Sequence, residues 1–245
     1  MAIEVFNRYE HKYLLDRCQF ENAVRIIEKY MEKDSHNVGE KPYTISNLYY
    51  DTPDDFLIRT SVSKPVYKEK LRLRSYGVPN LDSKVYLEIK KKFDGIVNKR
   101  RTTLSLSEAY EFLLSGVPPK PKGYMNTQVL REIEYFLKIY NLSPKLYLAY
   151  DRIAFFEKGN KDLRISFDMN IRTRRHDLRL EYGDSGERLL EGDVYLMEIK
   201  TSLAKPLWVT GMLAELDIKR QSFSKYGTEY KNFAKDFEYI RDEVI

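Results

Sequence analysis

Residues 68–77 read Lys-Glu-Lys-Leu-Arg-Leu-Arg-Ser-Tyr-Gly and predict a β-strand with one strongly basic face. Successive side chains of a strand alternate between its two faces. One face of this strand therefore carries four cations, at Lys68, Lys70, Arg72 and Arg74. Neighbouring like charges repel, but a solvated edge strand would carry them without any ligand. A ligand is indicated only where several strands repeat the pattern.

Seven further segments are predicted to be strands, and most of them combine one polar face with one apolar face. They are residues 7–14, 43–51, 84–92, 96–103, 145–156, 162–172 and 193–200. Their polar faces carry Arg8, Glu10, Lys12, Glu88, Lys90, Lys99, Arg101, Arg152, Arg164, Asp168, Glu198 and Lys200. Cations outnumber carboxylates on these faces, and a bound polyanion would supply the missing negative charge.

Two details of these segments bear on the architecture. Residues 162–172 alternate most cleanly, which predicts that Asn170 and Arg172 share the face of Asp168. Residues 85–90 and 194–200 have similar sequences, which suggests two related halves.

Apolar residues at helical spacing predict the helices that would cover the apolar strand faces. We expect helices from Asp16 to Met31, from Ser105 or Ser107 to Gly116, from Asn126 to Tyr140, from Pro206 to Leu216 and over residues 228–237. A sheet with helices outside must turn its charged face inward, and about eight strands can close into a barrel that holds one ligand. The alternative is an open sheet whose charged face is solvated and paired across strands.

Composition argues against several classes of protein. The 245 residues include 42 Lys and Arg against 37 Asp and Glu, and the net charge of +5 is too small for a general nucleic-acid coat. Aromatic residues also do not interleave with the basic faces as stacking platforms, so no nucleic-acid partner is expected. Cys18 is the single cysteine, which rules out an internal disulfide, and it is predicted to be a small core residue. Because the sequence shows no signal peptide and no run of about 18 apolar residues, we expect a cytoplasmic protein without a membrane segment.

The charged residues suit phosphate chemistry. Arg forms forked contacts with phosphate oxygens, and Lys acts as a mobile point charge. Candidate ligands for a divalent cation that bridges phosphates are Glu198, Glu88, Asp168 and Glu10. The sequence shows no Ser-His-Asp or Cys-His set, and no Gly-x-x-x-x-Gly-Lys phosphate loop. A tunnel of cations is therefore the expected way to hold phosphates.

Seven short motifs resemble, in their order along the chain, those of the VTC domain. This domain is the polyphosphate polymerase module of the vacuolar transporter chaperone family, a branch of the triphosphate tunnel metalloenzymes. The motifs are Arg-Tyr-Glu-His-Lys-Tyr at 8–13, Leu-Arg-Leu-Arg-Ser-Tyr-Gly at 71–77, Leu-Glu-Ile-Lys-Lys-Lys at 87–92, Tyr-Asp-Arg at 150–152, Arg-Ile-Ser-Phe-Asp at 164–168, Met-Glu-Ile-Lys at 197–200 and Ser-Lys-Tyr at 224–226. Each motif alone is weak, but the combination is specific and indicates one domain over residues 1–245.

The resemblance implies a fold, an activity and a site. The implied fold is α+β, an antiparallel eight-stranded β-barrel tunnel with helices packed outside, and the implied cofactor is Mn²⁺ or Mg²⁺. The implied activity transfers the γ-phosphoryl group of ATP to a growing polyphosphate chain. Implied catalytic residues are Lys12, Arg72, Arg74, Lys90, Arg152, Arg164, Lys200 and Lys225. Implied substrate-binding residues are Arg8, Lys70, Glu88, Lys99, Arg101 and Tyr150, and implied metal ligands are Glu198, Asp168 and Glu10.

One residue departs from the motif of the wider superfamily, and two alternative functions remain. The wider superfamily often begins with Glu-x-Glu-x-Lys, whereas Arg8 stands at the first Glu position, which favours the polymerase branch over hydrolase or cyclase relatives. The alternatives are a tripolyphosphatase or nucleoside triphosphatase in the same tunnel, and a non-catalytic polyphosphate-binding module. The transmembrane and phosphate-sensing parts of the eukaryotic complex are not found in this sequence, so translocation of the product would need a separate membrane partner.

Overall fold

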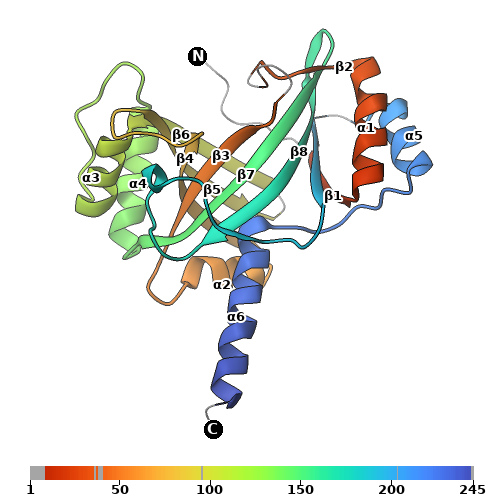
Figure 1. Ribbon diagram of the computed structural model, residues 1–245. Helices are drawn as coiled ribbons and strands as arrows, with labels where there is room; N and C mark the ends of the chain where they lie inside the picture. The colour runs from red at the N-terminus through yellow and green to blue at the C-terminus, as the bar shows by residue number, and fades with distance from the viewer. Residues whose placement is uncertain (1–8, 36, 38–40, 95, 203, 244–245) are drawn as a thin grey trace.

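The computed structural model describes residues 9–35, 37, 41–94, 96–202 and 204–243. Arg8 lies outside the described residues, so its predicted role stays a prediction. One large antiparallel sheet forms the body of the molecule, and helices flank it (Figure 1). The main path of the sheet runs β1-β10-β8-β7-β3-β4-β5-β6, while β2 pairs with β7 and β9 pairs with β8.

The strands match the predicted segments closely and include two short additions. They are β1 (Tyr9–Leu15), β2 (Met31–Lys33), β3 (Tyr43–Asp51), β4 (Tyr67–Tyr76), β5 (Lys84–Phe93), β6 (Ile96–Ser105), β7 (Ser143–Glu157), β8 (Asn160–Arg174), β9 (Glu187–Arg188) and β10 (Tyr195–Thr201). The helices are α1 (Arg17–Tyr30), α2 (Phe56–Val62), α3 (Leu106–Ser115), α4 (Thr127–Ile139), α5 (Leu207–Glu215) and α6 (Lys225–Glu243), with a 3₁₀ turn at Leu180–Tyr182.

Local capping explains why two predicted helices begin and end where they do. The Asp16 carboxylate accepts a hydrogen bond from the backbone N–H of Gln19, and the Gln19 side chain accepts one from the N–H of Asp16. Ser105 and Glu108 form the same reciprocal pair at the start of α3. Gly116 ends α3 with a φ of 72°, a conformation that favours glycine.

The sheet curls without closing through hydrogen bonds. Its antiparallel, eight-stranded main path confirms the predicted α+β class, but no ladder joins the edge strands β1 and β6 within the described residues. The outer edge of β1 instead meets the segment before α6, because Tyr13 bridges to Arg220 and the N–H of Gln221 donates to the carbonyl of Lys12. A tunnel-like, curled sheet therefore replaces the closed barrel.

Two helical layers cover the outer face of the sheet. On one side, α3 and α4 pack over β4, β5 and β6 around residues such as Leu73, Leu87 and Phe112 (Figure 1). On the other side, α1 and α5 pack over β1, β8 and β10 around Ile27 and Ile165. These apolar faces are the ones that strand alternation predicted, so the charged faces turn inward.

A β-bulge in β8 ends its charged face earlier than predicted. Asn170 has a φ of 49°, and the register between β7 and β8 shifts between Ala149 and Asp151. Beyond the bulge, Arg172 pairs with Asp151 at 3.2 Å, while Ile171 joins an inner apolar cluster. The prediction that Asn170 and Arg172 continue the face of Asp168 is therefore wrong, because the extra residue reverses the alternation.

Three smaller predictions also need correction. Cys18 is exposed on α1 rather than buried in the core. The last helix begins at Lys225, three residues before the predicted start, and α2 was not predicted at all. Within the described part of the chain, none of the helices has both the length and the apolar character needed to cross a membrane.

Candidate active site

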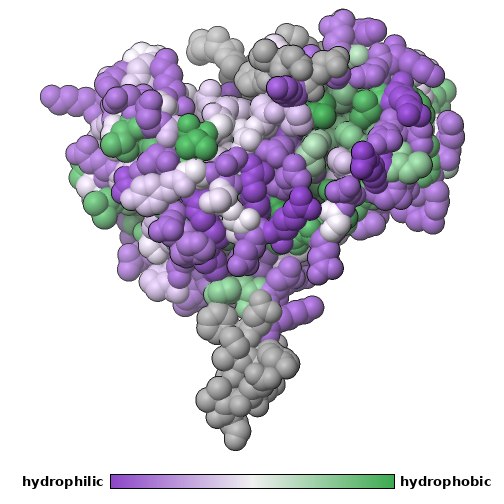
Figure 2. Space-filling model, in the orientation of Figure 1, coloured by the Kyte–Doolittle hydropathy of each residue, from purple (hydrophilic) through white to green (hydrophobic). Residues whose placement is uncertain are grey.

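The inward-facing side chains of the main-path strands form a charged surface, which we call the tunnel face. Because neighbouring strands are in antiparallel register, the predicted charged residues line up across the sheet: Lys12 is opposite Glu198, Arg152 is opposite Asp168 and Arg72 is opposite Glu88. Hydrophilic residues also cover much of the face seen in Figure 2, so exposure to water does not single out the site. Burial of charge does single out the site, since charged residues are seldom buried unless they are paired.

Glu198 on β10 is the centre of one charged cluster. Its side chain is 7% exposed, and its oxygens lie 3.1 Å from Lys200 Nζ, 3.5 Å from Lys12 Nζ and 3.5 Å from Lys225 Nζ. Arg152 Nη2 is also 3.5 Å away. Burial alone would raise the pKa of Glu198, but these four cations outweigh it and hold the pKa well below the usual value. Glu198 is therefore ionised.

Asp168 on β8 lies beside Glu198 and is fully buried. Arg152 donates two hydrogen bonds to its carboxylate, at 2.5 and 2.7 Å, and Lys225 donates a third at 2.5 Å. Burial opposes ionisation of Asp168, but Arg152 and Lys225 lower its pKa nevertheless. Both oxygens of Asp168 are thus occupied by cations of the protein, which positions Arg152 and Lys225.

Glu88 on β5 is the centre of a second charged cluster and is 1% exposed. Arg72 Nε donates to its Oε2 at 2.7 Å, Lys99 Nζ lies 2.6 Å from its Oε1, and Arg74 Nε is 3.8 Å away. Burial raises the pKa of Glu88 less than Arg74, Arg72 and Lys99 lower it, so the carboxylate is ionised. Three cations against one carboxylate leave this cluster net positive.

The two clusters occupy equivalent places in the sheet. Glu88 is on β5, next to the edge strand β6, and Glu198 is on β10, next to the edge strand β1. Each carboxylate follows an apolar residue and precedes Ile-Lys, in Leu-Glu-Ile-Lys and Met-Glu-Ile-Lys. The suggested two halves thus correspond to two ends of one curled sheet, each with one buried carboxylate surrounded by cations.

Lys70 and Lys90 are the cations of the tunnel face with the least compensation. Neither forms an ion pair within 4 Å among the described residues, although Lys70 lies 5.6 Å from the ring centre of Tyr226. Burial, helped by Lys90, lowers the pKa of Lys70 to about 7. Burial also lowers the pKa of Lys90 to about 8. The negative charge of Glu10 raises this pKa, but by less than burial lowers it. Both lysines would gain from a bound anion.

Glu10 joins the Glu198 cluster through shared lysines. Lys12 Nζ lies 3.3 Å from Glu10, and Lys200 Nζ lies 3.5 Å from it. Burial opposes its ionisation, but Lys200 and other nearby lysines lower the pKa of Glu10 to about 2. Two ionised carboxylates, Glu10 and Glu198, therefore flank the same pair of lysines.

Of the remaining predicted residues, Tyr150 is buried between the two clusters, whereas Arg164 and Arg101 lie outside them. Tyr150 accepts a hydrogen bond from Arg74 at 3.4 Å and lies under the Arg152 guanidinium. Arg164 pairs with Asp34 at 3.2 Å, and Arg101 is exposed and lies over the ring of Tyr86. The predicted strand residues that the structure describes thus share one face, and Lys225 reaches it from α6. Arg101 and Arg164, like Lys70 and Lys90, do not enter the two central clusters.

A divalent cation fits this site only in part. No three His, Cys, Asp or Glu side chains converge to hold a metal within the described ranges. Glu10 and Glu198 nevertheless offer ionised oxygens on one side of the tunnel. Mg²⁺ and similar ions often bind through one or two carboxylates together with phosphate oxygens and water. The residues present therefore fit a cation that substrate phosphates help to hold.

Several residues of the site escaped sequence reasoning. Asn47 accepts a hydrogen bond from Arg74 at 3.0 Å, and Tyr49 accepts one from Arg72 at 3.1 Å. Tyr226 packs against Tyr49 and donates to Asp51 at 3.3 Å. The alternation of residues 43–51 could have predicted that Asn47 and Tyr49 lie on the same face of the strand as Ile45. Tyrosines do interleave with the cations of the tunnel face, contrary to the sequence-based expectation.

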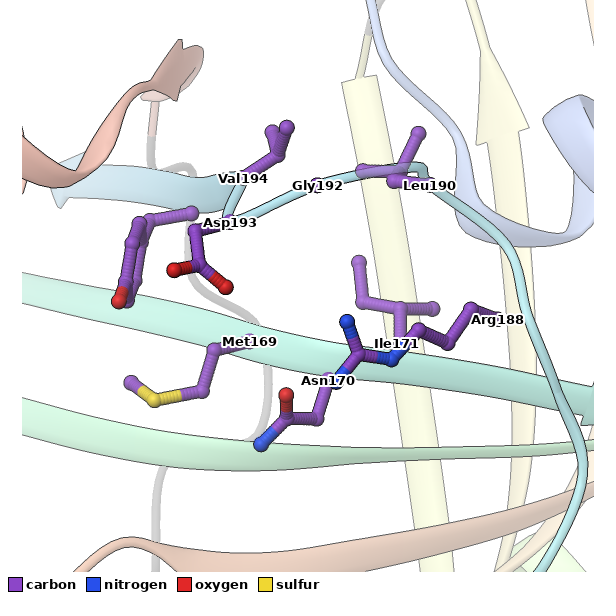
Figure 3. A pocket seen from close by; sticks show the side chains of 9 residues that line it. Met169, Asn170, Ile171, Arg188, Leu190, Gly192, Asp193 and Val194 are labelled. Carbon is purple, nitrogen blue, oxygen red and sulfur yellow. The ribbon is translucent and has the colours of Figure 1, made fainter.

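An open hollow of about 450 Å³ lies elsewhere, at the bulge of β8 (Figure 3). Its lining mixes Met169, Ile171 and Leu190 with Asn170, Arg188 and Asp193. Figure 3 shows one carboxylate and one guanidinium in it, without the concentrated buried charge of the tunnel face. We therefore place the candidate active site in the tunnel.

The fold and the site define a class of tunnel-fold proteins, in which a curled antiparallel sheet surrounds a basic interior that contains carboxylates. Similar solved structures include a Bacillus halodurans protein described as a putative adenylate cyclase, with 16% identity, a TM-score of 0.53, and coverage of 91% of this chain and 96% of that chain. Another is the putative adenylyl cyclase HpAC1 from Hippeastrum, described as having a dominant triphosphatase activity. It has 16% identity and a TM-score of 0.51, and covers 91% of this chain and 95% of its own.

The chain belongs to the VTC domain family, whose profile matches residues 7–234. The resemblance stated from the motifs is thereby confirmed, and so is the triphosphate tunnel fold. The comparison with curated proteins gives no significant match.

Proposed function

We propose that this protein is a metal-dependent polyphosphate polymerase. In the proposed reaction, a terminal oxygen of a polyphosphate chain attacks the γ-phosphorus of ATP. A new P–O bond lengthens the chain by one phosphate, the bond to the β-phosphate oxygen breaks, and ADP leaves with that oxygen and its electrons. Catalysis of such a transfer depends mainly on alignment and on neutralisation of charge, which fixed Arg and Lys side chains provide.

The observation that carries this proposal is the excess of positive charge around the buried carboxylates of the tunnel face. Arg72, Arg74 and Lys99 surround one carboxylate, and Lys70 and Lys90 have no ion pair within the described residues. A string of phosphates supplies negative charge at regular spacing along such a surface. Arg72 and Arg74 would bind its oxygens by forked hydrogen bonds, and the lysines would neutralise the rest.

The metal would lie on the Glu198 side of the tunnel. We assign Glu198 and Glu10 as its ligands, whereas Asp168 positions Arg152 and Lys225, because both Asp168 oxygens already accept hydrogen bonds from them. A bound divalent cation supplies charge neutralisation on the phosphate oxygens. Lys12 and Lys200, which bridge Glu10 and Glu198, would turn toward the phosphates.

The residues of the tunnel favour a phosphate nucleophile over water. His11 alternates to the outer side of β1, opposite Ile199, and the tunnel face carries no histidine among the residues described. Its carboxylates are ionised and their pKa values are lowered by the surrounding cations, which makes them weak general bases. A terminal phosphate oxygen is already anionic and needs no base, whereas water would benefit from one.

The test is the identity of the products from the purified protein with ATP and Mn²⁺. We expect ADP together with long phosphate chains that resolve as a ladder on a gel. Glu198→Gln should abolish metal-dependent turnover, and Glu21→Gln on the outside of α1 serves as the matched control that keeps it. ADP with inorganic phosphate alone would reject the polymerase, and tight binding of polyphosphate without turnover would identify a non-catalytic module.

Triphosphate hydrolysis is the second candidate function. It is favoured by one specific observation, since the Hippeastrum protein of the same fold is described as having triphosphatase activity. The same cations would hold the triphosphate, with water in place of the chain end. The product assay separates the two, because the hydrolase releases every transferred phosphoryl group as inorganic phosphate.

A further inference from the structure

Three tyrosines form a ladder across adjacent strands of the tunnel face. Tyr43 on β3, Tyr76 on β4 and Tyr86 on β5 share the inner side with Arg74 and Glu88. The ring centres of Tyr43 and Tyr76 are 5.9 Å apart, and those of Tyr76 and Tyr86 are 5.8 Å apart. The first pair of rings is tilted by 47° and the second meets edge to face at 85°, so the three rings form a row of neighbouring aromatic groups, which we call the tyrosine ladder.

The tyrosine ladder begins where the cations of the phosphate site end. Tyr86 on β5 is paired with Arg74 on the neighbouring strand β4, and Tyr76 follows Arg74 by two residues on β4. Tyr43 on β3 is paired with Arg152 on β7. From Tyr76 to Arg72 is four residues, or roughly 13 Å along a strand. A nucleoside triphosphate whose phosphates bind Arg72 and Arg74 can therefore reach the tyrosine ladder with its base.

The tyrosine ladder is not completely used for packing. Tyr76 is 41% exposed, although it lies on the concave side of the sheet. The guanidinium of Arg101, itself exposed, lies 4.9 Å from the ring centre of Tyr86 and forms a cationic cover. Burial raises the pKa of Tyr43 to about 12, so its ring stays neutral at physiological pH. A partly exposed aromatic ring beside an exposed arginine is a suitable place for a flat heterocycle to stack.

We infer that the tyrosine ladder and Arg101 bind the base of a nucleoside triphosphate whose phosphates lie in the tunnel. This inference rests on the proposed function and adds to it the place where the base of the nucleotide donor binds. Stacking uses the face of the base, which all bases share, so discrimination among nucleotides is weak. Larger purine rings cover more of the tyrosine ladder than pyrimidines, so ATP and GTP bind better than CTP and UTP.

The test compares two probes by calorimetric titration of the full chain, the non-hydrolysable analogue adenosine 5′-(β,γ-imido)triphosphate and inorganic tripolyphosphate. Tyr76→Ala and Tyr86→Ala should each weaken binding of the nucleotide analogue about tenfold, in line with the loss of one stacking contact. Both variants should bind tripolyphosphate within twofold of the parent. Tyr86→Phe keeps the ring and should restore nucleotide binding.

The control variant is Tyr182→Ala, which removes an exposed tyrosine far along the chain from the tyrosine ladder. Equal losses for both probes in the Tyr76 and Tyr86 variants, or no loss for either probe, would overturn the inference while tripolyphosphate binding by the parent still supports the tunnel. If the parent binds neither probe, the proposed function itself fails. Circular dichroism of each variant confirms that the comparison is made on folded protein.

Discussion

Glu88 and Glu198 show at the scale of single residues how the site is built. Each is a buried carboxylate with several cations in contact, so it holds together positive charges that would otherwise repel. Neither cluster is neutral, because the cations outnumber the carboxylate in both. Removing one partner of a buried charge pair usually costs several kcal/mol, mostly because the other partner is left without compensation. The carboxylates therefore prepare the tunnel for phosphates by holding the cations in place.

Glu88→Gln tests this role. The substitution keeps the shape of the side chain but leaves Arg72, Arg74 and Lys99 without their carboxylate, so we expect a loss of about 3 kcal/mol in the free energy of unfolding. Tripolyphosphate should restore more stability to this variant than to the parent, since it supplies the missing charge. Urea unfolding with and without tripolyphosphate measures both effects. Equal stability of variant and parent without ligand would show that Glu88 does not hold the cations.

Lys70 and Lys90 predict how phosphate binding depends on pH. Burial holds their pKa values at about 7 and about 8, so both lose their charge as the pH rises through this range. A bound polyanion favours the charged forms, so binding takes up protons and weakens as the pH rises from 7 to 9. Each lysine that titrates weakens binding by up to about tenfold per pH unit. Ionisation of tripolyphosphate itself contributes equally for every protein titrated, so a comparison between parent and variant isolates the contribution of the lysines.

Calorimetric titration of tripolyphosphate at several pH values measures this dependence. Arg stays charged throughout the range, so the affinity of the double variant Lys70→Arg, Lys90→Arg should fall less than that of the parent as the pH rises from 7 to 9. The same pH dependence in the parent and in the double variant would contradict the assignment of these lysines to the phosphate site.

At the scale of elements, strand β8 and helix α6 determine what the tunnel contains. The bulge at Asn170 turns Arg172 outward and Ile171 inward, so β8 contributes Arg164 and Asp168 to the charged part and an apolar residue beyond them. Helix α6 begins at Lys225 and brings Lys225 and Tyr226 into contact with Asp168 and Tyr49. The bulge thus marks the boundary between the charged residues of β8 and the apolar cluster that includes Ile171 and Tyr226.

Asn170→Val tests the importance of the bulge for the fold. Asn tolerates the left-handed conformation, but a β-branched residue does not, so we expect Val to lower the free energy of unfolding by about 1–2 kcal/mol. Asn170→Gly is the matched control, because both variants lose the hydrogen bond from Asn170 Nδ2 to Asp151, whereas Gly adopts the required φ readily. Chemical denaturation measures both. Equal stability of the two variants would mean that the bulge does not constrain this residue.

Much of the element level could be predicted from the sequence, and the exceptions have physical causes. Strand alternation predicted the apolar outer positions of Leu71 and Leu73, and the cap signals of Asp16 and Ser105 predicted where α1 and α3 begin. Helix α2 was missed, because its seven residues are too few to show a period. The bulge at Asn170 was missed because the alternation of its sequence is unbroken.

The candidate site was predictable in its members but not in its pairings. Charged residues on strand faces were readable from the sequence, yet the sheet order that brings β10 beside β1 and β8 is a long-range property. The pairing of Asp168 with both Arg152 and Lys225 depends on that order and on the start of α6. The part played by Tyr49, Tyr76 and Tyr86 depends on which strands become neighbours, which a local pattern does not contain.

At the scale of the whole molecule, the two helical layers and the curled sheet form a support for a charged interior. The apolar clusters on the two outer sides bury residues such as Leu73 and Ile165 completely, so stability comes largely from outside the tunnel. The tunnel face can then carry an excess of cations that a free-standing sheet would not tolerate. Because the outer apolar clusters supply most of the stability and the tunnel face supplies the binding, substitutions in the tunnel can remove ligand affinity without unfolding the protein.

Titration of tripolyphosphate into the parent protein and into the variants Arg72→Ala, Arg74→Ala and Arg17→Ala tests the central claim most directly. Arg72 and Arg74 lie on the tunnel face, whereas Arg17 is an exposed arginine on α1 that pairs with Glu21. We predict that each tunnel variant remains folded and binds at least about tenfold more weakly, as expected for the loss of one charge-assisted contact of roughly 1.5–3 kcal/mol. We predict that Arg17→Ala binds as the parent does. Equal affinity of all four proteins, or an equal loss in all three variants, would contradict the claim that the tunnel face holds the phosphates.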